Sequence, residues 1–159
     1  MKALSIKKIK DELQHRSPQD LVELCLLLSK FKKENKELIT YLLFEAHDEE
    51  MYVLSVKESM EILFDEINTK NFFYIRKSVR KILRLTKKYI RYSKKKETET
   101  QLLLHFCQQM KNIKPSISKS QRLQNIYDRQ ISMIKKAILT LHEDLQYDYQ
   151  LELDKLLNE

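Results

Sequence analysis

The chain of 159 residues contains no glycine and only two prolines, Pro18 and Pro115. Glycine takes positive φ values most readily, so its absence excludes glycine-rich phosphate loops and Asn-Gly hairpins. Sheet-rich folds rely on such turns, whereas helices do not. The composition therefore predicts an all-α protein without the loop motifs that hold nucleotide cofactors.

Long apolar runs are also missing. The longest aliphatic stretch lies around residues 24–28, whereas a helix that spans a bilayer needs roughly 20 apolar residues. Residues 1–13 alternate Ile and Leu with charged side chains and lack the apolar block of a signal peptide. We expect a cytoplasmic protein without membrane insertion. Its two cysteines, Cys25 and Cys107, fall in apolar helical patterns, so we expect buried thiols and no disulfide.

Apolar residues recur at three- and four-residue steps along most of the chain, which is the spacing of amphipathic helices. The sequence Ser17-Pro18-Gln19-Asp20 is a strong helix start. We predict about seven helices, which cover residues 5–14, 18–31, 38–44, 48–67, 72–93, 99–113 and 119–157. The last is either one long helix or two helices with a bend near residues 142–147. One long helix is favoured, because no helix-breaking residue forces the bend.

The helix at 18–31 is apolar around most of its circumference, as helices in the middle of a protein are. We therefore expect a central helix that pairs with the next one as an antiparallel hairpin. Residues 1–159 would form a single all-α domain, with helical hairpins over 5–93, a helix at 99–113 and the long or bent helix at 119–157. This succession of helical pairs resembles the armadillo and HEAT-type folds, with an irregular bundle as the alternative. The resemblance lies in pattern alone and implies no activity and no site residues.

Charge is unevenly distributed along the chain, whose net charge is +7. Residues 70–96 contain twelve Lys or Arg and no acid. Residues 43–69 contain eight acids and one Lys, and residues 143–159 contain six acids and one Lys. The basic block is the strongest indication of a binding surface.

On the helix at 72–93, eight cations fall within an arc of roughly 140° that is separate from the apolar stripe. They are Arg76, Lys77, Arg80, Lys81, Arg84, Lys87, Lys88 and Arg91, and the face is extended by Lys94, Lys95 and Lys96. Tyr74 and Tyr92 are expected at its rim, where they would stack on bases. Such a row of cations attracts a phosphate backbone. The alternatives are a solvated face partly paired with the acidic helix at 48–67, or the acidic face of a second copy. A membrane surface is disfavoured, because the apolar stripe is expected to be in the core.

Metal sites are poorly supported. Glu12 and His15 have the Glu-x-x-His spacing of di-iron bundles, but the second such motif is missing. His142 is followed by Glu143, yet Gln146 stands where a zinc-protease motif needs its second histidine. We expect no metal and no cofactor.

Catalytic constellations are equally incomplete. His105 and Cys107 are two residues apart and point to different sides of a helix, so they do not form a nucleophile–base pair. The acidic run 47–50 lies at a predicted helix start, where carboxylates stabilise the positive end of the helix. The mixture of acids and tyrosines at 143–149 either contacts a partner or closes the helix stack.

These observations predict a scaffold or adaptor that is not an enzyme and has no small-molecule substrate. It would present charged helix faces to a protein partner, including a second copy of itself. The alternative is a nucleic-acid-binding protein that uses the basic face of the helix at 72–93.

Overall fold

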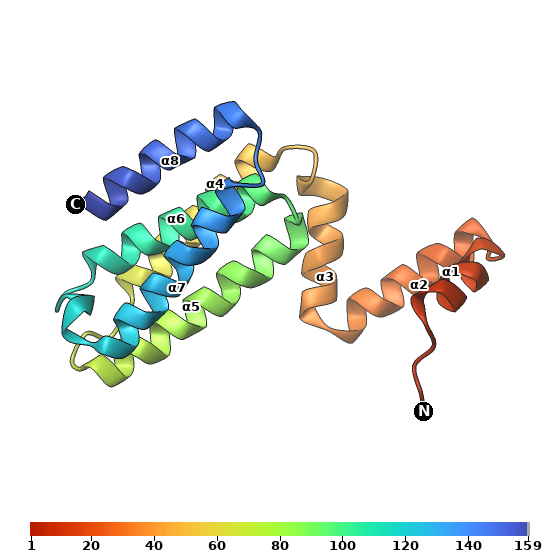
Figure 1. Ribbon diagram of the computed structural model, residues 1–159. Helices are drawn as coiled ribbons and strands as arrows, with labels where there is room; N and C mark the ends of the chain where they lie inside the picture. Colours follow the sequence, from red (N-terminus) through yellow and green to blue (C-terminus); the bar gives the residue numbers. More distant parts are fainter. Residues whose placement is uncertain (159) are drawn as a thin grey trace. The chain divides into compact units, whose positions relative to one another are not determined.

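The computed structural model describes residues 1–158, and within them it has eight α-helices and no strand (Figure 1). The prediction of an all-α protein is confirmed. The helices are α1 (Ile6–Gln14), α2 (Pro18–Phe31), α3 (Lys33–Thr40), α4 (Glu49–Asp65), α5 (Phe72–Ser93), α6 (Lys96–Asn112), α7 (Gln121–Ile138) and α8 (Glu143–Asn158). A π-helical turn, Tyr41–Glu45, precedes α4, and a 3₁₀ turn, Ile117–Lys119, precedes α7. Among the described residues, no helix combines the length and apolar character that crossing a bilayer requires.

The chain divides into two compact units, Met1–Phe44 and a second that begins at Glu45. The single domain over 1–159 stays a prediction. The hairpin pairing of α2 with α3 and the armadillo-like stack also stay predictions.

The core of the second unit is built around α6, which contacts α4, α5, α7 and α8. Leu102, Leu103, Phe106 and Met110 of α6 are completely buried. The ring of Phe106 meets that of Phe64 on α4 edge to face, with centroids 5.5 Å apart. Because α6 is apolar on several sides, four amphipathic helices can each bury a stripe against it.

Local signals place the helix ends. Ser17 and Asp20 form a reciprocal capping box at the start of α2, and the side chain of Asn71 caps α5. At the end of α5, Lys94 adopts a left-handed conformation with φ 60°. Glycine usually fills this position at low cost, and in its absence a lysine ends the helix there. Helix α6 then begins at Lys96, three residues earlier than predicted.

The C-terminal segment is two helices, so the preferred prediction of one long helix is wrong. Helix α7 ends at Ile138 and α8 begins at Glu143, which puts the break before the bend predicted near 142–147. Gln146 Nε2 donates to the carbonyl of Leu141 at 2.7 Å and stabilises the turn. The break allows α8 to pack against α6 and bury Tyr149, Leu153 and Leu156. A continuous helix would have carried these side chains past the core.

The prediction that the helix at 18–31 is central is also wrong. No residue of α1, α2 or α3 is buried. Cys25 on α2 is exposed, in contrast to the prediction, whereas Cys107 on α6 is buried as predicted. Helix α2 is therefore exposed although it is apolar around most of its circumference.

Candidate functional site

Residues of α5 and α7 line a groove of about 780 Å³ in the second unit. Seven cations and no carboxylate line it. Five come from α5 and two from α7, namely Arg76, Lys77, Arg80, Arg84, Lys87, Arg122 and Arg129. We call this feature the basic groove. Within the described chain none of the seven pairs with a carboxylate, including those of the acidic helix α4.

Three residues of the lining of the basic groove are apolar. Phe73, Leu83 and Ile126 line it between the cations, and the Phe73 side chain is 61% exposed. The rings of Phe73 and Tyr74 meet edge to face, with centroids 5.5 Å apart. Tyr74 is exposed, whereas Tyr92, which was expected at the rim, is buried and cannot stack on a ligand.

A second hollow of about 530 Å³ continues along the C-terminal half of α5. Lys87 belongs to both hollows, and the further cations of this one are Arg91, Lys94 and Lys96. Unlike the basic groove, this hollow contains a carboxylate, because Glu99 lines it and forms an ion pair with Lys96 at 2.7 Å.

Three residues of the predicted basic face line neither hollow. Lys95 Nζ forms an ion pair with Glu49 at 3.0 Å, and Lys88 Nζ lies 4.9 Å from the centre of the Tyr89 ring. Lys81 is exposed but lines neither hollow. Fewer cations of α5 line the two hollows than the predicted basic face contains. Two cations of α7 contribute in addition.

Sequence reasoning missed Arg122 and Arg129. The two residues are seven apart and flank Ile126, so all three lie on one face of α7. That spacing was visible in the sequence. What was not visible is that this face turns toward α5, because periodicity describes one helix at a time.

The acidic run at 47–50 stabilises the start of a helix, as its position in the sequence predicts. Asp48 accepts a hydrogen bond from the backbone N–H of Met51 and caps α4. Glu49 accepts hydrogen bonds from the hydroxyl groups of Ser93 and Thr98, the second at 2.5 Å. This carboxylate therefore connects the start of α4 to the end of α5 and the start of α6.

His105 and Cys107 do not form a catalytic pair. Burial raises the pKa of the Cys107 thiol to about 12, so it stays protonated and unreactive. His105 Nε2 lies 3.2 Å from Glu61 Oε1, in an orientation that gives no hydrogen bond. Burial lowers the pKa of His105 below its usual 6.5, although Glu61 acts in the opposite direction.

The described residues contain no group of three or more metal-ligating side chains. Glu12 and His15 lie at the end of α1 and are both exposed. His142 Nδ1 lies 3.8 Å from Asp144 Oδ2, and both side chains are exposed. In the acidic C-terminal stretch, Tyr149 donates to Glu97 at 2.8 Å and ties α8 to α6, as a helix that closes the stack would.

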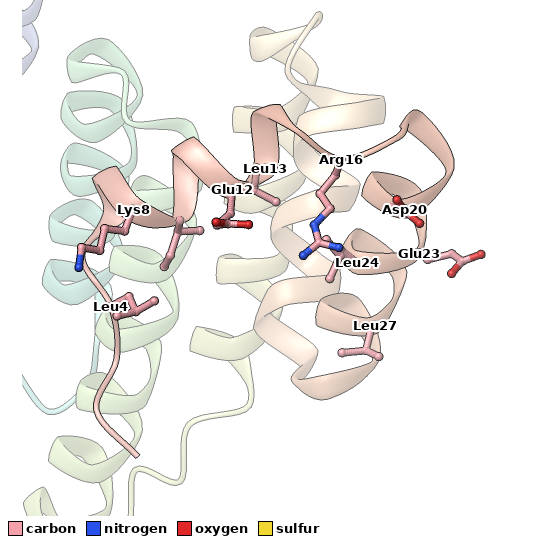
Figure 2. Close-up of a pocket in the computed structure, with 10 residues that line it drawn as sticks. Leu4, Lys8, Glu12, Leu13, Arg16, Asp20, Glu23, Leu24 and Leu27 are labelled. Carbon is pink, nitrogen blue, oxygen red and sulfur yellow. The ribbon is translucent and has the colours of Figure 1, made fainter.

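The first unit has a different character. Helices α1 and α2 border a hollow of about 480 Å³, which five apolar and five charged residues line. Figure 2 shows Leu13, Leu24 and Leu27 around it, with charged residues of both signs nearby. The large apolar side chains of this unit are widely exposed, and they include Leu4, Ile6, Ile9, Leu13, Val22, Leu24, Leu26, Leu27, Leu28, Phe31, Leu42, Leu43 and Phe44. We call this set the apolar N-terminal surface.

Comparison with protein-family models, with curated proteins and with solved structures gives no match to this chain.

Proposed function

We propose that this protein is a non-enzymatic helical scaffold that associates with a second copy of itself through its first unit. One observation carries the proposal: α1, α2 and α3 bury no residue, although α2 is apolar around most of its circumference. A helix of this kind gains stability by packing and not by solvation.

The apolar N-terminal surface exposes a large apolar area. At roughly 80 Å² for each half-exposed large side chain, its thirteen side chains present on the order of 1,000 Å², distributed over more than one side of α2 and over the neighbouring elements. A standard interface buries about 800 Å² per partner, and a monomer rarely leaves so much apolar surface in water. The area therefore favours a protein partner of comparable size over a short peptide.

A second copy fits this surface because α2 has two apolar faces, and only one of them faces α1. Leu24 and Leu27 on one side of α2 line the hollow beside α1. Val22, Cys25 and Leu26 lie on the opposite side of the helix and are exposed. Two copies related by a two-fold axis would bury this second face by packing α2 against α2.

The test is the solution mass of the full chain, measured by sedimentation equilibrium at micromolar concentration. The wild type should be a dimer, and Val22→Glu combined with Leu26→Glu should be a monomer, with dissociation constants that differ by more than about 100-fold. Both side chains are about half exposed, so helix content should not change. Lys30→Glu alters the net charge by the same amount on the polar side of α2 and should stay dimeric. A monomeric wild type would overturn the proposal.

Cys25 provides an independent readout. It lies between Val22 and Leu26 on the proposed contact face and is exposed, while Cys107 is inaccessible. A short thiol-specific cross-linker should join two chains through Cys25, and the product should disappear in Cys25→Ser. The proposal also places the protein in the cytoplasm, where an exposed thiol stays reduced.

A further inference from the structure

We propose that the basic groove binds the backbone of single-stranded nucleic acid and that Phe73 stacks on a base. This site is separate from the surface through which we propose self-association. The inference depends on the charge of the groove, its length and the apolar residues in its lining.

The charge of the groove calls for an anionic ligand. Seven cations line one hollow of about 780 Å³ without a carboxylate among them. Like charges held close together repel one another, and none of the seven is paired within the described chain. A bound polyanion would relieve this repulsion and release its own counterions to the solvent.

The length of the groove fits a polymer better than a single phosphate. Arg76, Arg80, Arg84 and Lys87 follow one another along α5 at steps of three or four residues, which places successive charges about 5–6 Å apart. Arg122 and Arg129 of α7 line the same groove and are separated by about 10 Å along their helix. A row of roughly 15–20 Å bordered by two helices accommodates several nucleotides of an extended strand.

The exposed aromatic rings distinguish a single strand from a duplex. Phe73 lines the groove and is 61% exposed, and its ring contacts that of Tyr74, which is 43% exposed. In a duplex the faces of the bases are stacked on each other, whereas a single strand offers them to aromatic rings. An exposed ring among cations is the combination that binds single strands with little sequence preference.

A membrane surface is a weaker explanation of the same cations. A helix that lies on a bilayer inserts its apolar face into the lipid. The apolar face of α5 is already occupied, because Ile75, Val79 and Ile82 are buried in the protein core. Anionic vesicles are therefore a control in the test and not the proposed ligand.

The test uses the full chain and fluorescently labelled 20-nucleotide oligo(dT) and oligo(U), with anisotropy measured between 50 and 200 mM salt. Affinity should fall with salt at a slope of about −0.7 per phosphate contact. Arg122→Glu with Arg129→Glu should weaken binding at least 10-fold and flatten the slope. Lys135→Glu with Lys136→Glu makes the same charge change at exposed positions of α7 outside the groove and should change affinity less than 2-fold.

A second variant separates nucleic acid from polyanions in general. Phe73→Ala should weaken oligonucleotide binding about 10-fold without altering the salt slope, and it should not affect binding of inorganic polyphosphate. Three results would each overturn the proposal: no binding at 50 mM salt, equal effects of the two α7 double variants, or an unchanged affinity in Phe73→Ala. Binding to phosphatidylserine vesicles without binding to oligonucleotides would also overturn it.

The result does not depend on the oligomeric state. Val22→Glu with Leu26→Glu alters only the first unit, so the affinity of each chain for a short oligonucleotide should stay within 2-fold of the wild type. A monomeric protein that binds would refute self-association alone, and a dimer that does not bind would refute the groove alone.

Discussion

Replacement of Glu49 by alanine should lower the free energy of unfolding by about 3 kcal/mol. The carboxylate lies in the first turn of α4 and accepts hydrogen bonds from the hydroxyl groups of Ser93 and Thr98. It also forms an ion pair with Lys95 at 3.0 Å. The substitution therefore removes one group that connects three helix ends.

The three contacts contribute unequally. Thr98 is 1% exposed, so its hydroxyl would lose its partner without gaining water, at a cost of about 1–3 kcal/mol. Ser93 is only partly buried. Losing its hydrogen bond to Glu49 should cost nearer about 1 kcal/mol, because water can replace the carboxylate. Lys95 is 52% exposed, which limits the ion pair to less than about 1 kcal/mol.

Urea unfolding followed by circular dichroism would measure the effect. With a slope of about 2 kcal/mol/M, the midpoint should fall by roughly 1.5 M. Glu50→Ala is the matched control, because Glu50 also lies in the first turn of α4 but is exposed. It removes the same interaction with the helix dipole and should cost less than about 1 kcal/mol.

A double variant tests the assigned cause. If the orphaned hydroxyl dominates, adding Thr98→Val to Glu49→Ala should recover about 1 kcal/mol, whereas Thr98→Val alone should be destabilising. Equal losses in Glu49→Ala and Glu50→Ala would refute this reasoning. So would a double variant that is less stable than Glu49→Ala.

Three further predictions concern the second unit and the thiols. Phe106 is fully buried, so Phe106→Ala should cost about 3–5 kcal/mol of unfolding free energy, while Leu157→Ala, at a 43% exposed position, should cost less than about 1 kcal/mol; similar losses would contradict the core assignment. Burial lowers the pKa of His105 below 6.5, so as the pH falls through 6.5 the unfolded chain gains a proton first and stability decreases. The decrease relative to His105→Gln, measured by urea unfolding from pH 8 to pH 5, should be absent above about pH 7.5, and parallel curves for the two proteins would rule out this role. A thiol reagent at neutral pH should modify one cysteine in the native protein and two in denaturant, because Cys25 is exposed and Cys107 is buried; two fast-reacting thiols in the native state would contradict the burial of α6.

Much of the secondary structure was predictable because its signals are local. The start at Ser17-Pro18 and the limits Phe72 and Ser93 of α5 appear in the structure as predicted. Capping side chains act on backbone groups three residues away, and a sequence shows them directly. The end of α7 was not predictable in this way, because no proline or glycine marks it.

The basic groove was predictable only in part. The cations of α5 were found from their spacing, and the structure places Arg76, Arg80 and Arg84 in one groove. The contribution of Arg122 and Arg129 depends on the side of α6 against which α7 packs. Tyr92 was assigned to the rim for the same reason, since the helical period alone does not show how far the core extends around α5.

By itself, the sequence determined that this protein is helical, where most of its helices begin and end, and that one helix carries a concentrated positive charge. These properties follow from interactions within one or two helical turns. The tertiary structure decided that α6 is the central helix of the second unit, that α2 buries no residue, that α8 turns back against α6, and that α7 completes the basic groove. An apolar helix face shows that burial is favourable but does not identify the surface that covers it, because hydrophobic burial has no direction and depends on which elements meet.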